Sequence, residues 1–97
     1  MRFDAQFMDS AVEDYDAIID YLSQFYPSTP TKFLNELHKK VEQIKNSPQS
    51  CPVYQPIPEY RRANVLRYGM FYKVFEDREM IEIHRIIHSA MNIPEIL

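Results

Sequence analysis

The side chains most able to do chemistry in this sequence are basic and lie in its second half. They recur where neighbouring strands could bring them together: Arg61, Arg62, Arg67, Lys73, Arg85 and His88. Such a basic patch can clamp a phosphate beside a scissile RNA bond, or it can dock an acidic peptide segment. It can also be an ordinary solvated sheet rim with cross-strand charge pairs. The residue types leave these three interpretations open.

The other reactive residue types predict no metal site and no local catalytic site. His84 and His88 would chelate a metal on a helix, but in a strand they stand about 13 Å apart. Cys51 is the only cysteine, and residues 46–58 hold no basic side chain that would activate it. A lone thiol also favours a reducing, cytoplasmic setting. Because Gly69 is the only glycine, there is no Gly-rich phosphate loop, and we expect neither a metal nor a cofactor.

The charge balance of the chain is acidic. Its 97 residues include 11 Lys+Arg and 14 Asp+Glu, a formal net charge of −3. The excess lies in residues 1–48, with five basic and eight acidic side chains, whereas residues 49–97 hold six of each. A protein that grips nucleic acid through many phosphates is strongly basic. We therefore expect no sequence-specific nucleic-acid binding by this chain alone. Because the chain has no long apolar stretch, we also expect no membrane span and no signal peptide.

The first half of the chain predicts a strand followed by two helices. Residues Arg2–Met8 alternate between apolar and polar side chains, as in a half-buried strand. Ser10 and Glu13 form a predicted capping box at the start of an amphipathic helix of about four turns. Thr29 as N-cap and Pro30 at the first helical position start the second helix, and the short connection favours an antiparallel hairpin. The carboxylates on the outer face of the first helix are expected to be solvated: Asp14, Asp16 and Asp20.

The second half predicts three strands after a Pro-rich loop. Period-2 alternation places them at about Tyr60–Arg67, Met70–Glu76 and Met80–His88, with Asp77–Glu79 as a hairpin turn. The predicted fold is a single α+β domain over residues 1–97 with the order β-α-α-β-β-β, in which the helical hairpin packs on one face of a three-stranded antiparallel sheet. The apolar side chains expected in its core are Val12, Tyr15, Ile19, Leu22, Phe33, Leu37, Val41 and Ile44 from the helices, and Phe3, Phe7, Val74, Ile81, Ile83 and Ile87 from the strands.

The order of these motifs resembles the RelE/ParE superfamily of toxins from bacterial type II toxin–antitoxin systems. The segments Arg67–Phe75, Met80–His88 and Ser89–Pro94 are similar to the family's aromatic-rich strand, its strand ending in I-x-R-I-x-H and its following short motif. The helical segments are similar to the family's hairpin, so the resemblance covers essentially the whole chain. It implies a cytoplasmic toxin that arrests growth and is neutralised by a cognate antitoxin.

The resemblance implies one of two activities. RelE-like members cut mRNA on the ribosome, whereas ParE-like members poison DNA gyrase without known nuclease chemistry. Met91 stands here where many relatives carry Arg, and Gly69 stands where nuclease members often have a strand Arg. The loss of two cations, together with the acidic balance, favours ParE-like inhibition of DNA gyrase. A ribosome-dependent mRNA endoribonuclease is the alternative, and a detoxified relative that only binds antitoxin is a third.

The resemblance also implies candidate residues for each role. In a nuclease, the phosphate clamps and proton-transfer groups would be the six basic residues of the second half named above. The surface for the antitoxin is expected at side chains on and beside the sheet: Met70, Phe71, Tyr72, Phe75, Arg67 and Arg85. The apolar members of this set are expected to be exposed.

Overall fold

The computed structural model describes residues 2–97 and contains four strands, three α-helices and one 3₁₀ helix. Their bounds, in chain order, are β1 (Asp4–Phe7), α1 (Asp9–Leu22), α2 (Ser28–Asn46), β2 (Arg61–Val65), β3 (Tyr68–Phe75), η1 (Glu76–Arg78), β4 (Met80–His88) and α3 (Ile93–Ile96). This order confirms the predicted β-α-α-β-β-β arrangement and the α+β class. Within the described residues, no helix is both long enough and apolar enough to span a membrane.

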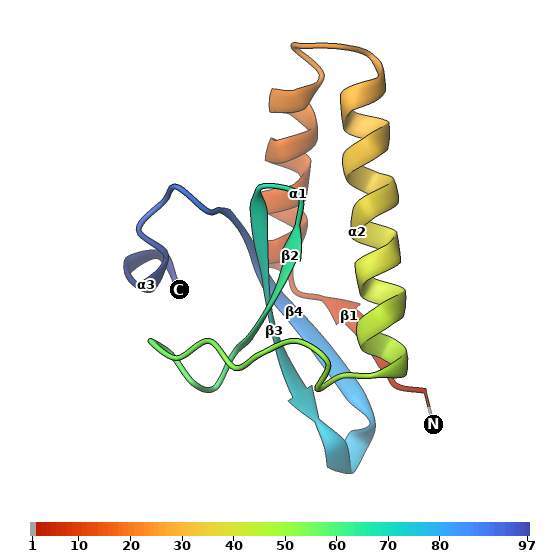
Figure 1. Ribbon diagram of the computed structural model, residues 1–97, viewed down its shortest axis with the longest axis vertical. Helices are drawn as coiled ribbons and strands as arrows, with labels where there is room; N and C mark the ends of the chain where they lie inside the picture. Colours follow the sequence, from red (N-terminus) through yellow and green to blue (C-terminus); the bar gives the residue numbers. More distant parts are fainter. Residues whose placement is uncertain (1) are drawn as a thin grey trace.

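The strands form one mixed sheet in the order β1-β4-β3-β2 (Figure 1). Strands β2, β3 and β4 are antiparallel neighbours, as predicted. Strand β1 lies parallel to β4, with Asp4 opposite Met80 and Phe7 opposite Ile83. The sheet therefore has four strands, because the N-terminal strand joins the predicted three-stranded sheet at its β4 edge.

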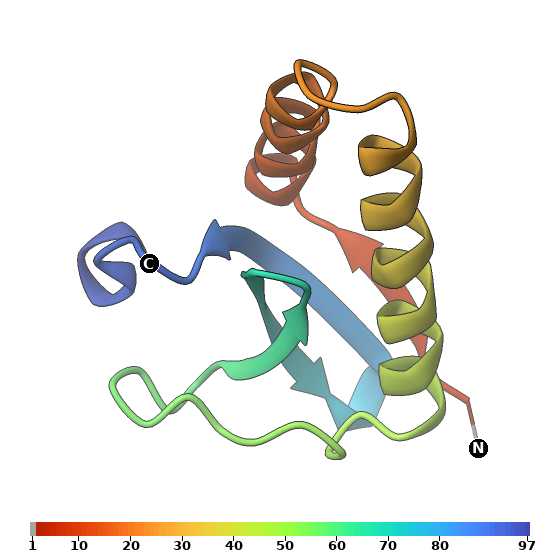
Figure 2. The ribbon, with the colours of Figure 1, turned by 45° about the horizontal axis from the view of Figure 1, so that its top comes forward.

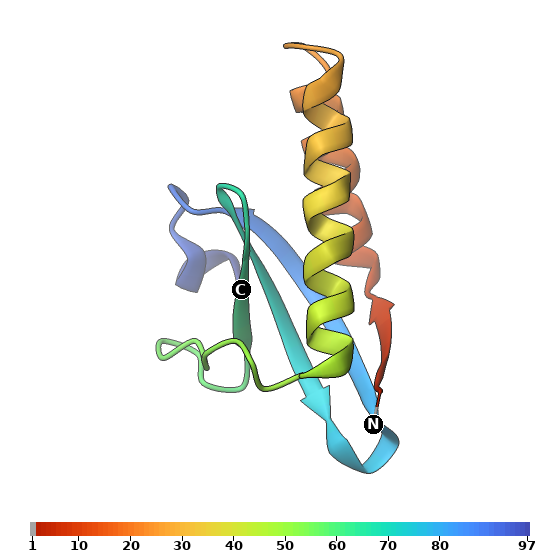
Figure 3. The ribbon, with the colours of Figure 1, turned by 45° about the vertical axis from the view of Figure 1, so that its right-hand side comes forward.

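Helices α1 and α2 run antiparallel as a hairpin whose far end projects beyond the strands (Figures 1 and 3). The sheet separates the hairpin from α3, which lies on the opposite side (Figure 2). The main core lies between hairpin and sheet and includes Phe33, Leu37 and Ile44 from α2 with Ile81 and Ile83 from β4. Burial of each such side chain contributes about 1.5–3 kcal/mol to stability. The predicted packing of the hairpin on one sheet face is confirmed.

The starts of both helices differ from the prediction. Helix α1 begins at Asp9 after Met8, without a side-chain cap, and the Ser10 hydroxyl donates instead to the backbone carbonyl of His84 at 2.7 Å. The predicted capping box is therefore wrong, because Ser10 lies inside the first turn and bonds to the sheet. Helix α2 begins at Ser28, so Pro30 lies in the first turn, where its missing N–H breaks no intrahelical hydrogen bond.

A β-bulge in β4 places Ile86, in place of the predicted Ile87, in the core under the hairpin. Phe71 is opposite Arg85 and Tyr72 is opposite Ile83, so His84 has no partner across the ladder. The extra residue reverses the alternation of side chains beyond it. As a result Ile86 joins the core under the hairpin, and the prediction of Ile87 there is wrong. Val12 is half-buried and lies outside this core cluster, whereas the other predicted positions lie in it or pack against it.

The opposite face of the sheet has a second, smaller core. Phe71 and Ile87 from the sheet pack there against Ile93 of α3. Tyr54 and Tyr60 from the loop before β2 pack against this cluster, as do Ile96 and Leu97. Both faces of β3 are therefore covered, the first by the hairpin and the second by α3 and the loop.

The turn between β2 and β3 lies two residues earlier than predicted. Strand β2 ends at Val65 and β3 begins at Tyr68, so Leu66 and Arg67 form the turn that the prediction placed within a strand. Leu66 has a φ of 54°, in the left-handed region that side chains other than glycine rarely adopt. The predicted turn at Asp77–Glu79 between the last two strands is confirmed; it is formed by η1 and by Glu79, which has a φ of 49°.

Candidate functional site

An open groove of about 1000 Å³ lies where the helical hairpin projects past the sheet. Its walls are the end of α1, the start of α2, the β2–β3 turn and the end of β4. The lining residues are Ala17, Ile18, Tyr21, Leu22, Ser28, Thr29, Lys32, Leu66, Arg67, Tyr68 and His88. We call this hollow the hairpin groove. The two helix ends are joined by a short loop, but the β2–β3 turn and the end of β4 come from far along the sequence, so the groove exists only in the folded chain.

Large apolar side chains are exposed in and beside the hairpin groove. Tyr21 and Leu66, which line it, are 54% and 48% exposed. Just beyond the end of α1, Phe25 and Tyr26 are 57% and 76% exposed, and Phe25 packs edge-to-face on Tyr21 with ring centroids 5.2 Å apart. Exposed apolar side chains that cluster around a concavity are typical of a protein-binding surface.

The charged residues that line the hairpin groove are basic. Lys32 and Arg67 are exposed at its rim, His88 lies at the end of β4, and no Asp or Glu is among the described lining residues. The His88 ring packs edge-to-face on Tyr68 at 5.2 Å, and its Nδ1 accepts the Ala90 backbone N–H at 3.0 Å. Burial raises the pKa of Tyr68, and the nearby Tyr21 adds to the effect, so this phenol stays neutral. The groove therefore fits an apolar segment that carries acidic groups.

Arg85, a candidate in both predicted sites, is held by an ion pair. Its Nε and Nη2 donate to the two carboxylate oxygens of Asp14 at 2.7 and 3.0 Å, and Nη1 donates to the Ile96 carbonyl at 3.3 Å. The hydrogen bond to Asp14 raises the pKa of Arg85. Asp14 also accepts the Ile86 backbone N–H at 2.9 Å. Ile86 lies beyond Ile83, the last residue of β4 that pairs with β1, so Asp14 takes the place of a strand partner there. The expectation that Asp14 is a solvated surface carboxylate is therefore wrong.

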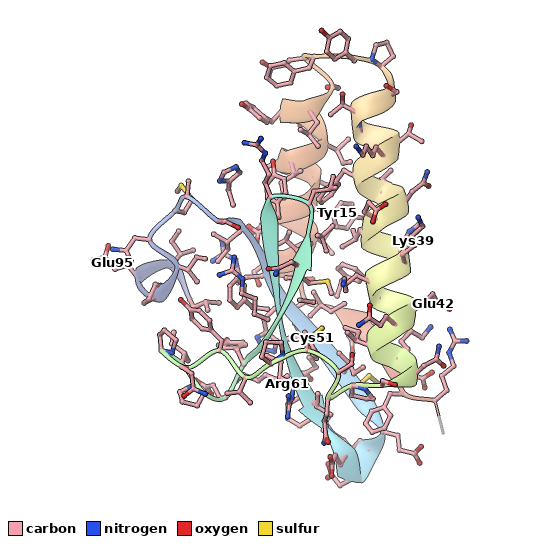
Figure 4. The ribbon with its side chains drawn as sticks, viewed as in Figure 1. Tyr15, Lys39, Glu42, Cys51, Arg61 and Glu95 are labelled. Carbon is pink, nitrogen blue, oxygen red and sulfur yellow. The ribbon has the colours of Figure 1, made fainter. Side chains whose placement is uncertain are left out.

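The other predicted nuclease residues do not converge. Arg61 donates to the Cys51 carbonyl at 2.7 Å (Figure 4), whereas Lys73 pairs with Glu59 at 3.2 Å and lies over the Tyr60 ring. Arg67 points to the hairpin groove. Arg62 lies over Phe71 on the face of the sheet opposite the helical hairpin. The structure thus brings Arg67 and His88 to one groove and distributes the remaining four cations among separate contacts.

The exposure expected for the antitoxin-binding set is also wrong at three positions. Met70, Phe71 and Tyr72 are completely buried, because β3 is covered on both faces. The Tyr72 hydroxyl donates to the Pro48 carbonyl at 2.8 Å, and burial raises its pKa. Phe75, at the end of β3, is half-buried, and only Arg67 is exposed and lines the hairpin groove. The signal for this groove that the prediction missed is the aromatic group Tyr21, Phe25 and Tyr26 immediately before Pro27.

Solved structures with the same fold are toxins and toxin–antitoxin complexes. The chromosomal ParDE system of P. aeruginosa matches with a TM-score of 0.77 at 18% identity, over 92% of this chain and 98% of that chain. The RelBE2 complex of Mycobacterium tuberculosis matches with a TM-score of 0.65 at 13% identity, over 91% and 99%. The intact E. coli RelBE complex matches at 0.64 and 12%, over 92% and 99%. The chain therefore shares its fold with the toxins of these ParDE and RelBE systems.

The sequence comparison shows the family of this chain. Residues 5–93 match the family model described as the ParE toxin of the type II toxin–antitoxin system parDE. The chain belongs to the ParE toxin family. No curated protein matches its sequence significantly.

Proposed function

We propose that this chain is a cytoplasmic toxin that arrests growth by inhibiting DNA gyrase and is neutralised by a cognate antitoxin. Membership of the ParE toxin family supports the class of toxin. The observation that carries the choice of target is the separation of the candidate cations. A site that cleaves a phosphodiester needs several positive groups directed at one developing charge, and here they point to different partners.

The contacts of the individual cations argue against a nuclease site. Asp14 neutralises Arg85, and Glu59 pairs with Lys73. Gly69 stands where nuclease members often carry arginine, and Met91 stands where many relatives carry it. Met91 is 56% exposed and has no charged group. A toxin that acts by binding a protein target needs no such cluster.

The hairpin groove is the proposed docking site of the antitoxin. Its apolar floor suits one face of an amphipathic segment, and its basic rim of Lys32 and Arg67 suits acidic residues on that segment. A disordered antitoxin tail would order as it fills the groove, so that apolar burial offsets the entropy of ordering. Arg67 keeps its predicted role in this proposal, whereas the buried β3 side chains have none.

A paired assay tests the target. Purified protein is tested for inhibition of supercoiling and stimulation of DNA cleavage by gyrase, and in parallel for cuts in translated mRNA by primer extension. Gyrase inhibition without mRNA cuts is the expected result. Specific mRNA cuts with unaffected gyrase would overturn the proposal in favour of the endoribonuclease.

The docking site is tested by co-expression with the protein encoded by the adjacent reading frame. We expect a complex that co-purifies, and Leu66→Asp should weaken it about 10-fold or more because a carboxylate replaces an apolar contact. Lys39→Asp, on the outer face of α2, is the control (Figure 4). If no complex forms and the toxin causes no growth arrest, the assignment fails. If a complex forms without toxicity, and Met91→Arg creates toxicity, the chain is the detoxified relative instead.

A further inference from the structure

The Arg62 side chain extends from β2 over β3, on the face of the sheet opposite the helical hairpin. Hydrogen bonds hold its guanidinium there. Its Nε donates to the Asn64 side-chain carbonyl at 3.2 Å, and its Nη2 donates to the Ser89 hydroxyl at 3.0 Å. The group also lies over the Phe71 ring, 5.5 Å from the centroid. Strand β3 lies between Arg62 and Ser89, so the side chain spans β3 to reach the segment after β4.

Gly69 leaves the space that this arrangement needs. A Cβ at residue 69 would lie 2.9 Å from Arg62 Nε and 2.9 Å from Phe71 Cε2, both closer than a real Cβ contact. Phe71 is completely buried and has no room to move away. Gly69 stands where nuclease members often have an arginine, and its lack of a side chain makes room for the guanidinium of Arg62.

Arg62 has no carboxylate partner among residues 2–97. Six other cations of the described chain pair with a carboxylate, among them Arg2 with Glu42, Lys73 with Glu59 and Arg85 with Asp14. Lys32, Lys40, Arg61 and Arg67 share with Arg62 the lack of one, but Arg62 is held by two side-chain hydrogen bonds on the sheet. A guanidinium has five N–H donors, and the described contacts of Arg62 use two of them. An arginine that is oriented by neutral groups and keeps unused donors can accept an anion from another molecule.

The site adjoins the hairpin groove. Ser89 directly follows His88, which lines the groove, and the Ser89 backbone N–H donates to the carbonyl of Arg67, another lining residue, at 2.9 Å. A peptide segment that leaves the groove past the end of β4 therefore comes within reach of Arg62.

We propose that Arg62, together with the Ser89 hydroxyl, binds one carboxylate of an acidic side chain on the antitoxin segment that occupies the hairpin groove. This inference rests on the proposed function. A carboxylate accepts the remaining donors of the guanidinium in the planar, two-pronged geometry that arginine favours. A nucleic-acid phosphate is disfavoured because the chain carries a net charge of −3, whereas proteins that bind a phosphate backbone use many cations.

The test compares antitoxin affinity of toxin variants by titration calorimetry at two salt concentrations. Arg62→Gln should weaken binding about 10- to 100-fold, and the loss should shrink at high salt. Arg62→Lys should recover only part of the affinity, because an ammonium lacks the planar fork. Gly69→Ala should weaken binding as well, because its Cβ displaces Arg62. Arg2→Gln, which removes an exposed arginine far from the groove, is the matched control and should change affinity less than 2-fold.

The outcomes separate this inference from the function beneath it. Equal affinity of wild type and Arg62→Gln for the antitoxin overturns the carboxylate site and leaves the toxin assignment intact. Unchanged antitoxin affinity with lost binding of a single-stranded RNA oligonucleotide identifies a phosphate site and also overturns it. If the wild-type chain binds no antitoxin, the carboxylate site falls, and the proposed function falls with it when the chain also causes no growth arrest. Thermal unfolding of each variant, followed by circular dichroism, confirms that a change in affinity is not a loss of fold.

Discussion

Substitution of Asp14 by alanine should destabilise the fold far more than expected for a residue that the sequence pattern places on the solvent-facing side of α1. The change removes both hydrogen bonds to Arg85 and the acceptor of the Ile86 backbone N–H. The two side chains are 16% and 28% exposed, so solvent compensates for part of the loss. Removal of one partner from a fully buried pair costs about 3–5 kcal/mol, and an orphaned buried N–H costs about 1–3 kcal/mol.

Allowing for the exposed fraction, we expect Asp14→Ala to lower the free energy of unfolding by about 2–4 kcal/mol. In a domain of this size the melting temperature should fall by roughly 10–25 °C. Urea and thermal unfolding measure the change, with Asp16→Ala, two residues along the same helix and exposed, as the control. A double-mutant cycle with Arg85→Met should show a coupling energy well above that of an exposed ion pair. Equal small effects of Asp14→Ala and Asp16→Ala would refute the reasoning.

Three further predictions concern the core, a buried phenol and the strained turn. Leu37→Ala should cost about 2–5 kcal/mol in unfolding experiments because it leaves a cavity under the hairpin, whereas Lys39→Ala should cost little, and similar values would mean that the helix faces are misassigned. Since burial raises the pKa of Tyr72 above its ordinary value of 10, its contribution to stability is complete below pH 10 and is lost as pH rises further; Tyr72→Phe should flatten this alkaline decline, and an unchanged pH profile would contradict it. Leu66→Gly should relieve the left-handed strain and raise the free energy of unfolding by about 1 kcal/mol, yet it should weaken antitoxin binding, and a loss of stability would show that the turn is unstrained.

The sequence predicted the parts of this fold that repeat along the chain. The two helices followed from apolar positions at 3–4 spacing and from Pro27 and Pro30, and the strands followed from period-2 alternation. The features that the sequence did not predict each depend on a single residue that no local sequence pattern marks. The bulge at His84 inserts a single residue into an otherwise regular strand, and the turn at Leu66 contains no Gly, Asn or Asp to mark it.

The candidate site was harder to predict because burial of β3 is a long-range effect. The pattern around Phe71 does not reveal that α3 and the loop before β2 cover its outer face. The pairing of Arg85 with Asp14 likewise joins residues at opposite ends of the chain. Chemistry by residue type could be predicted, whereas the partner of each charged group required the structure.

The parallel pairing of β1 with β4 has a consequence for folding during synthesis. Asp4 finds its sheet partner only at Met80, so the first strand waits for most of the chain before its hydrogen bonds can form. Closing so long a loop carries an entropic cost that local helix formation does not. The helical hairpin can therefore form early, but its apolar face stays uncovered until β4 is available. A partner that binds such a nascent hairpin would bind it before the sheet is complete. At that stage the hairpin groove still lacks the wall that the β2–β3 turn and the end of β4 form.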